Sequence, residues 1–250
     1  MKNRFTENYR RTHSQKDKKC LVEMDIETKL AVLDRILKIY GDFAGNLDTA
    51  CKRYCSQCCT RNVTLTALEG YNIAEYLVSN KKSALFEILK NESSHKRFKP
   101  EITTNRLADL CIQGKDIPDE DSDSAWGSCP FLQDNECPVY PARPFGCRCF
   151  VSYHNCREHG YAYTEPFVVT VNNVFLQYIE HIDTPGYSGN LTDVLLFMES
   201  KENRRKYKTG TLQNPNNNGL ISNYPLKVLM IPPEHRQRIK PVIEAIQEIR

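Results

Sequence analysis

The stretch Cys129-Pro-Phe-Leu-Gln-Asp-Asn-Glu-Cys137-Pro-Val-Tyr-Pro-Ala-Arg-Pro-Phe-Gly-Cys147-Arg-Cys149-Phe places four cysteines in one short window of the chain. An earlier window, Cys51-Lys-Arg-Tyr-Cys55-Ser-Gln-Cys58-Cys59, holds four more of the eleven cysteines. A C-x2-C spacing lets one turn of backbone offer two sulfurs to one metal ion, and two such elements complete a four-sulfur shell. The two windows together therefore predict a metal-binding core.

The eight window cysteines are the predicted metal ligands: Cys51, Cys55, Cys58, Cys59, Cys129, Cys137, Cys147 and Cys149. Adjacent cysteines do not easily face one ion in a relaxed backbone, and eight thiolates exceed the four that one structural zinc needs. An iron–sulfur cluster, or two, is therefore the favoured cofactor. Zinc is the alternative, because His154, Cys156 and His159 add nitrogen and sulfur donors just downstream, unless those histidines are ordinary loop residues.

Two arginines of the second window, Arg143 and Arg148, are candidate cofactor-binding residues. A metal centre with four thiolates carries net negative charge, which a guanidinium group offsets. A salt bridge to an acid elsewhere is the competing interpretation. Outside the windows, Cys111 is expected to be an inert core thiol on the apolar side of a helix.

The composition of the chain argues against some classes of protein. It has 250 residues and 34 basic against 31 acidic side chains, and a net charge of +3 argues against a dedicated nucleic-acid binder. Residues 1–20 read as a basic, disordered tail, neither a signal peptide nor an anchor, and no stretch has the length of apolar sequence that spans a membrane. We therefore expect a cytoplasmic protein with no nucleic acid or membrane partner, in which clustered cysteines bind metal rather than form disulfides.

Hydrophobic periodicity predicts a mainly α fold with little β structure, in which helices pack around an irregular cysteine-rich core. Expected domains are a cysteine-cluster region over residues 21–160 and a helical region over 161–250, packed as one unit. The predicted helices are 24–40, a short one after Leu47, 66–77, 83–90, 103–114, 164–182, 190–198 and a final one after Pro233. Thr66 and Glu69 form the pattern of a capping box. Residues 62–66 suggest a strand, 116–124 a loop, 213–219 a connector, and 226–231 a strand or an apolar docking segment.

The order of these motifs resembles one known family. Cys55-Ser-Gln-Cys58-Cys59, followed by Cys129-Pro-Phe-Leu, Cys137-Pro-Val-Tyr and Arg143-Pro-Phe-Gly-Cys147-Arg, is similar to the YkgJ-like CxxCxxCC family of zinc- or iron-chelating proteins. The resemblance covers about residues 51–150 and implies metal chelation, by zinc or by an iron–sulfur centre. The family's first gap is usually two residues, whereas three separate Cys51 from Cys55 here.

Several functions remain open from the residues. The favoured one is a metal-cluster protein with a redox, metal-handling or docking role, which would work with a protein or redox partner. An enzyme is the alternative: Cys51-x3-Cys55-x2-Cys58 has the spacing of radical S-adenosylmethionine enzymes, and the motif also resembles part of the flagellin lysine methylases. The chain lacks their βα alternation and any G-x-G-x-x-G loop. A metal-independent thiol oxidoreductase is a weaker candidate, because no apolar strand precedes Cys55.

Overall fold

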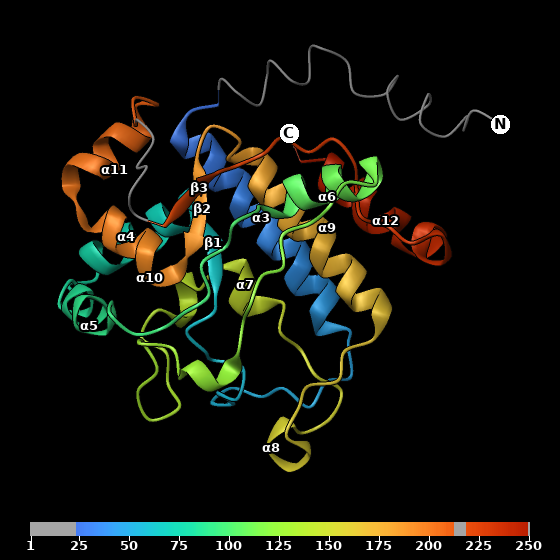
Figure 1. The fold of residues 1–250 in the computed structure, drawn as a ribbon, viewed down its shortest axis with the longest axis horizontal. Helices are drawn as coiled ribbons and strands as arrows, with labels where there is room; N and C mark the ends of the chain where they lie inside the picture. Colours follow the sequence, from blue (N-terminus) through green and yellow to red (C-terminus); the bar gives the residue numbers. More distant parts are fainter. Residues whose placement is uncertain (1–23, 213–218, 250) are drawn as a thin grey trace.

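Two long helices, α3 (Ile26–Gly45) and α9 (Pro166–Ile182), lie against each other in the computed structural model, which describes residues 24–212 and 219–249 (Figure 1). The Asp25 side chain caps α3 by accepting the Thr28 N–H at 2.7 Å, and Pro166 stands in the first turn of α9, where its missing N–H costs nothing. Both helices were predicted, and α3 continues past Gly41 to Gly45.

Shorter helices surround this pair. They are α4 (Ala67–Ser79), α5 (Leu85–Glu92), α6 (Thr104–Gln113), α7 (Phe145–Arg148), α8 (Cys156–His159), α10 (Leu191–Glu199), α11 (Lys201–Lys208) and α12 (Arg236–Gln247), with 3-10 turns at Ser124–Trp126, Tyr140–Ala142 and Pro233–His235. The capping box of α4 is present: Thr66 accepts the Glu69 N–H at 3.3 Å, and the Glu69 carboxylate accepts the Thr66 N–H at 3.0 Å.

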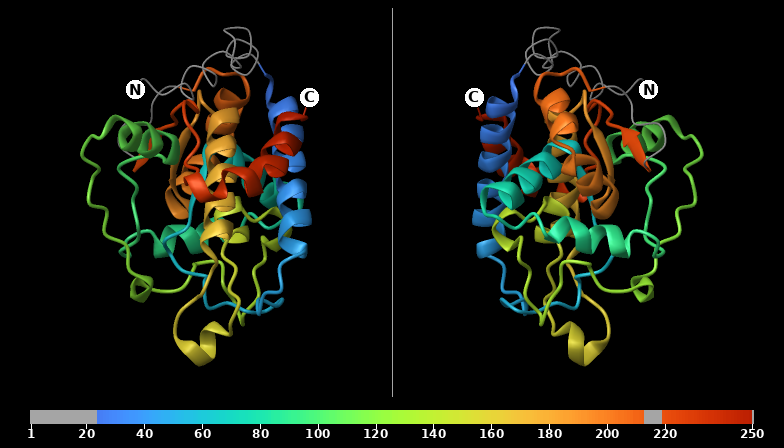
Figure 2. Two further views of the ribbon diagram at one scale, coloured as in Figure 1. Left: turned by 90° about the vertical axis from the view of Figure 1, so that its right-hand side faces the viewer. Right: turned by 90° about the vertical axis from the view of Figure 1, so that its left-hand side faces the viewer.

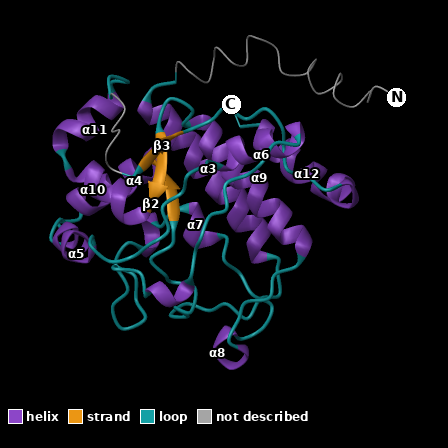
Figure 3. Cartoon of the chain, in the orientation of Figure 1, coloured by secondary structure: helices purple, strands orange, loops and turns teal. Residues whose placement is uncertain are grey.

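A small antiparallel sheet joins segments that are distant in sequence (Figure 3). Its order is β1 (Thr64–Thr66), β2 (Tyr187–Asn190) and β3 (Leu220–Ser222), with Leu65 opposite Gly189 and Ser188 opposite Ile221. The described chain is thus mainly helical with little β structure, as expected.

One hydrophobic core runs between the helices and reaches the cysteine-rich segment. Its centre includes Tyr40 of α3, Phe145 of α7 and Phe175 of α9, and the Tyr40 ring meets the other two edge-on at centroid distances of 4.7 and 5.1 Å. Cys129, Cys137, Cys147 and Cys149 pack against this core as partly buried residues. Apolar packing therefore supports the cysteine-rich segment from one side.

The cysteine-rich loops occupy one end of the molecule. Residues 46–63 leave the end of α3, and residues 115–165 lead from α6 to the start of α9. Much of both segments lies in the lower part of Figure 1 and of both views of Figure 2, with α8 lowest and α7 nearer the centre of Figure 1. The irregular core predicted around the metal therefore corresponds to a loop-built end of a helical body. We call these two segments together the cysteine loops.

One predicted helix is absent, and one helix of the structure was not predicted. The chain after Leu47 forms turns instead of a helix, because its backbone bonds elsewhere, as when the Ala50 N–H donates to the Ser152 carbonyl at 2.8 Å. The polar run after Glu199, for which the sequence predicted no helix, forms α11. Ser200 caps α11, and Glu202 pairs with Arg205 three residues later, so local interactions replace apolar burial.

The buried face of α6 also differs from the prediction. Cys111 is exposed, whereas Asn105 and Asp109 are buried. Asn105 donates to the Gln177 carbonyl of α9 at 2.9 Å, and Asp109 accepts the Tyr224 hydroxyl at 2.8 Å. Polar contacts therefore select the face of α6, and Cys111 is not a core thiol.

The segment 226–231 forms no strand in the described structure. It runs extended along α9, where Gln177 donates to the Val228 carbonyl at 2.7 Å and accepts the Met230 N–H at 2.9 Å, while Leu226, Leu229 and Ile231 pack on the core. The docking alternative is therefore confirmed. The predicted tail 1–20 and most of the predicted connector 213–219 lie outside the described residues. Within the described ranges, no helix combines the length and the apolar character needed to cross a membrane.

Candidate metal centre

Backbone pairing brings the two cysteine windows side by side. The Cys129 N–H donates to the Cys59 carbonyl at 2.9 Å, and Thr60 and Ser128 form an antiparallel bridge next to this bond. The Arg61 N–H then donates to the Gly127 carbonyl at 3.1 Å. Two stretches that are far apart in sequence therefore form one short ladder, which places Cys59 beside the start of the second window.

Tight turns shape each window. The Cys55 N–H donates to the Lys52 carbonyl at 3.0 Å and the Cys59 N–H to the Ser56 carbonyl at 2.9 Å. In the second window, the chain reverses between Cys129 and Cys137 through Asp134 and Asn135, whose φ angles of 48° and 63° are left-handed. The turns bring successive thiols of a window near each other.

Helix α7 carries Cys147 and is held by three neighbouring elements. The Glu69 carboxylate of α4 accepts the Phe145 N–H at 2.7 Å, at the first residue of α7. Gly146 lies so close to β1 that a Cβ there would stand 2.9 Å from the Thr64 carbonyl oxygen. Asn172 of α9 donates to the Cys149 carbonyl at 2.9 Å and accepts the Tyr40 hydroxyl at 2.9 Å. The scaffold therefore fixes where the Cys147 side chain begins.

The thiols of both windows act on one another electrostatically. A hydrogen bond with the Cys58 thiol lowers the pKa of Cys59, while burial and the nearby thiols of Cys129, Cys147 and Cys137 oppose this shift. Burial raises the pKa of Cys147 well above its ordinary value, and the thiols of Cys129, Cys137 and Cys58 add to the rise. These five thiols therefore share one neighbourhood, in which a bound cation would favour their thiolate forms.

Burial dominates the pKa of the remaining second-window thiols. It raises the pKa of Cys129 to about 11 and that of Cys149 to about 12. The Cys149 Sγ lies 3.5 Å from the Gly146 carbonyl oxygen, within its own helical turn. Cys149, a predicted ligand, thus has a partner other than the neighbouring thiols.

Cys51 lies at the edge of the cluster beside a segment that follows the second window. The Ser152 N–H donates to the Cys51 Sγ at 3.2 Å, and burial, opposed by this bond, raises the pKa of Cys51. The thiols of Cys55, Cys58 and Cys156 raise it further. Cys156 belongs to neither window, and the spacing of the windows gave no reason to include it with Cys51.

The two histidines near Cys156 contact each other and a nearby tyrosine. The His154 and His159 rings lie 4.3 Å apart between centroids, and His154 Nε2 lies 2.8 Å from the Tyr161 carbonyl oxygen. One ring nitrogen of His154 therefore already has a polar partner. The thiols are the larger set of donors at this end of the molecule.

Arg143 and Arg148 have different surroundings. Arg148 donates to the Arg143 carbonyl at 3.0 Å and to the Pro141 carbonyl at 3.1 Å, so it holds the loop backbone. The Arg143 guanidinium lies 4.0 Å from the centroid of the Tyr140 ring, and its Nε is buried without a hydrogen-bond partner. The positive charge of Arg143 lowers the pKa values of Cys58, Cys137 and Cys147, against larger effects that raise them.

Arg61 is a second cation near the thiols that sequence reasoning missed. Its guanidinium pairs with Glu92 at 2.6 Å, its Nε is buried without a hydrogen-bond partner, and its charge lowers the pKa of Cys129 against the effect of burial. In the sequence, the feature that could have indicated this role of Arg61 was its position two residues after Cys59.

The donor set fits a thiophilic metal. All ten cysteines of the described ranges have free thiols, and Cys20 lies outside those ranges. As the side chains stand in residues 24–212 and 219–249, no three Cys, His, Asp or Glu groups surround a point where a metal ion would bind. Soft thiolate ligands favour zinc and iron–sulfur centres over hard cations.

Comparison with known families agrees with this donor chemistry. Residues 50–166 match the model of the CxxCxxCC family, described as a putative zinc- or iron-chelating domain. The matched segment covers 117 of the 250 residues of the chain. The match spans both cysteine windows and also Cys156, and it confirms the resemblance predicted from the sequence. No curated protein and no solved structure matches the chain.

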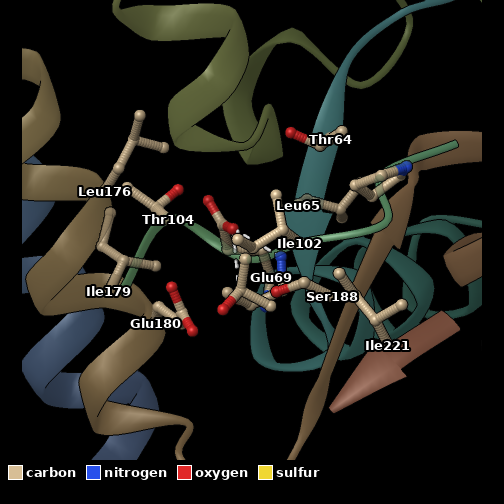
Figure 4. Close-up of a pocket in the computed structure, with 13 residues that line it drawn as sticks. Thr64, Leu65, Glu69, Ile102, Thr104, Leu176, Ile179, Glu180, Ser188 and Ile221 are labelled. Atoms are coloured by element: carbon tan, nitrogen blue, oxygen red, sulfur yellow. Dashed lines mark hydrogen bonds between the residues drawn. The ribbon is translucent and has the colours of Figure 1, made fainter. Parts of the chain in front are cut away.

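A separate small pocket lies between β1, the start of α6 and α9 (Figure 4). Its lining includes the carboxylates of Glu69 and Glu180. Glu180 accepts the N–H groups of Asn105 and Tyr224, both at 2.7 Å, and Glu69 accepts those of Thr66 and Phe145. Because both acids already bind backbone donors, we assign them a structural role.

Proposed function

We propose that this chain is an iron–sulfur protein whose cluster is bound by thiolates of the cysteine loops. The observation that carries the proposal is the shared neighbourhood of Cys59 with Cys129, Cys137 and Cys147, which come from two separate windows. Four thiolates are the usual ligand set of a [4Fe–4S] or [2Fe–2S] cluster. The CxxCxxCC match supports a zinc- or iron-chelating role for the same segment.

The type of donor and its setting favour iron–sulfur over zinc. The thiols outnumber the four ligands of one structural zinc, and His154 has a backbone partner, which leaves a sulfur-rich donor set. Arg143 and Arg61, each with a buried Nε that lacks a partner, supply positive charge beside a centre that carries net negative charge.

Within this proposal the cluster has two consequences for the protein. It links loops that contain little regular secondary structure, and so contributes to their folding. It also gives the chain a redox or metal-handling role with a protein partner. Exposed aromatic side chains near the cysteines, Tyr140 at 41% and Phe150 at 56%, support a contact surface beside the cluster.

The test is the metal content of the full chain purified without oxygen. We expect a brown protein that contains iron and acid-labile sulfide, and we expect Cys147→Ser to lose both. Cys111→Ser is the matched control, because Cys111 is an exposed thiol on α6 and should leave the content unchanged. A colourless protein with stoichiometric zinc would show that the site binds zinc and not an iron–sulfur cluster. Absence of any metal would reject metal binding itself.

A further inference from the structure

Helix α6 is held to the rest of the protein through a mostly polar face. Its buried residues are Asn105, Ala108 and Asp109, and none of its residues belongs to the hydrophobic core of the described chain. The Asn105 N–H donates to the Glu180 carboxylate of α9 at 2.7 Å, and Asp109 accepts the Tyr224 hydroxyl at 2.8 Å. The helix therefore lies outside the core, and in the left view of Figure 2 it is seen, in green, toward the outside of the molecule.

The other side of α6 is apolar. Leu107, Leu110 and Cys111 stand three and four residues apart, so they share one side of the helix, away from its buried face. Leu107 and Leu110 are half-buried and Cys111 is exposed, while Ile112 and, beyond the helix, Ile117 are 59% and 46% exposed. A helix normally turns its apolar side toward the core, so this arrangement leaves an apolar surface available for another segment. We call these five residues the α6 surface.

An acidic loop, residues 116–123, follows directly after α6. It contains five Asp or Glu residues and no Lys or Arg. Lys96 lies 3.4 Å from the Asp121 carboxylate, whereas Asp116 and Asp119 are exposed and have no ion-pair partner within the described ranges. Apolar surface beside unpaired negative charge fits an occupant that is both apolar and basic. A second copy of this chain fits poorly, because its own acidic loop would repel the first.

Residues 1–23, which precede the described chain, have the required composition. Residues 1–19 hold seven Lys or Arg and two acids. The segment joins α3, whose Lys29 lies 4.0 Å from the carboxylate of Asp183, the residue that follows α9. Because α6 binds Glu180 in the last turn of α9, the start of α3 and α6 attach at the same end of that helix. An extended chain spans about 3.3 Å per residue, so the segment is long enough to reach α6. Its apolar residues include Phe5, Tyr9, Leu21 and Val22.

We propose that residues 1–23 bind to the α6 surface and the acidic loop of the same chain. Apolar side chains of the segment cover the α6 surface, and its Lys and Arg side chains pair with Asp116 and Asp119. Both parts of the contact are needed, because an exposed ion pair alone contributes little. None of the predicted metal ligands takes part, so this inference does not depend on the proposed function.

Zero-length cross-linking of the full chain tests the contact. A carbodiimide joins a Lys Nζ to an Asp or Glu carboxylate only where the two groups meet, and mass spectrometry identifies the joined peptides. In dilute wild-type protein we expect cross-links within one chain from Lys16, Lys18 or Lys19 to the acidic loop. Salt at about 1 M, where the Debye length is about 3 Å, should reduce their yield severalfold.

A pair of variants tests the apolar part of the contact. Ile112→Ser should lower the yield of these cross-links severalfold, because it removes an exposed apolar side chain of the α6 surface. Val78→Ser is the matched control: Val78 is 42% exposed on α4 and should leave the yield unchanged. Equal yields in the two variants would overturn the apolar part.

The rate at which Cys111 is alkylated gives a second readout. A bound segment shields this thiol, so we expect it to react severalfold faster when Lys18→Gln and Lys19→Gln are combined. The control combines Lys38→Gln and Lys240→Gln, at exposed cations elsewhere, and should keep the wild-type rate. Equal rates in the two variants would overturn the inference. So would wild-type protein without cross-links from the segment to the acidic loop, or with such cross-links only between two chains, which would assign the α6 surface to a second copy.

Discussion

Arg143 differs from Arg148 in what its guanidinium group contacts. Arg148 bonds two loop carbonyls, whereas Arg143 faces the thiols with a buried Nε that lacks a partner. We expect Arg143→Gln to weaken metal retention, because it removes the positive charge that offsets the thiolates. Loss of a group next to a metal's ligands typically costs roughly tenfold to a hundredfold in affinity. The measurement is the rate of metal release to an excess of chelator.

Arg157→Gln is the control for that change. Arg157 lies in the same loops and is exposed, so its charge is screened by solvent. Its variant should release metal at the wild-type rate, and Arg143→Lys should behave between wild type and Arg143→Gln. Equal release rates for the two glutamine variants would show that the charge of Arg143 has no special role.

Single residues also show how far sequence reasoning about the site could reach. Cys59, Cys129, Cys137 and Cys147 stand in short, recognisable motifs, so their spacing alone made them candidate ligands, and they remain a prediction. Cys156 was left undecided, because its closeness to Cys51 depends on the hydrogen bonds of Ser152, which no spacing rule contains. Cys111 was misassigned for a related reason: α6 turns a polar face inward through side-chain bonds that periodicity does not register.

At the scale of elements, the contact of α7 with β1 positions Cys147. Gly146→Ala would bring a Cβ to 2.9 Å from the Thr64 carbonyl oxygen, which is backbone and has little freedom to move. We expect α7 to shift and the free energy of unfolding to fall by about 1–3 kcal/mol. Equilibrium denaturation with urea measures the change, and metal content shows whether Cys147 still serves as a ligand.

Gly41→Ala, another glycine substitution within a helix, is expected to have the opposite effect on the free energy of unfolding. A Cβ at Gly41 of α3 would meet nothing within 4 Å, so alanine should stabilise the protein by about 0.5–1 kcal/mol. Equal effects of the two substitutions would mean that close approach of α7 to β1 does not limit stability.

The elements that the sequence predicted well have strong local signals. The capping box at Thr66 and Glu69, the proline at the start of α9 and the apolar stripe of α3 all appear as expected. The helix expected after Leu47 failed because that backbone bonds Ser152, far along the chain. β2 and β3 were missed for a similar reason: they are short, and their pairing joins distant segments, so little in either sequence reveals them.

At the scale of the whole molecule, Asp183 couples stability to pH. Its carboxylate is fully buried and accepts the Tyr207 hydroxyl at 2.6 Å and the Leu68 N–H at 3.0 Å. Burial raises its pKa from 3.8 to about 7, although the bond from Tyr207 and the charge of Lys29 oppose the rise. Between these two values the folded protein keeps a proton that the unfolded chain has released.

The contribution of Asp183 to stability should therefore be fully present below pH 3.8 and be lost as pH rises through about 7. The loss amounts to about 4 kcal/mol across that range. We expect Asp183→Asn to remove this slope, as measured by urea denaturation at several pH values. Glu75→Gln, at an exposed acid on α4, should keep the wild-type slope. If both variants gave the same pH dependence, Asp183 would not be the responsible group.

Removal of metal should affect the cysteine loops and spare most of the helical body. The loops are held by turns and by their thiols, whereas α3 and α9 pack through the apolar core. After chelation, we expect hydrogen exchange to rise in residues 46–63 and 115–165, and the helices α3, α9 and α10 to keep their protection. Unchanged exchange in the loops would show that metal does not stabilise them.

The chain also contains an intrinsic fluorescent probe close to the second cysteine window. Trp126, the single tryptophan, stands three residues before Cys129, and the Lys96 ammonium lies 4.0 Å from the centroid of its ring. A nearby iron–sulfur cluster would accept energy from the excited indole and so quench the fluorescence of Trp126. Zinc, which absorbs no visible light, would leave the fluorescence unquenched. Fluorescence of the unlabelled protein can therefore follow the filling and emptying of this site in real time.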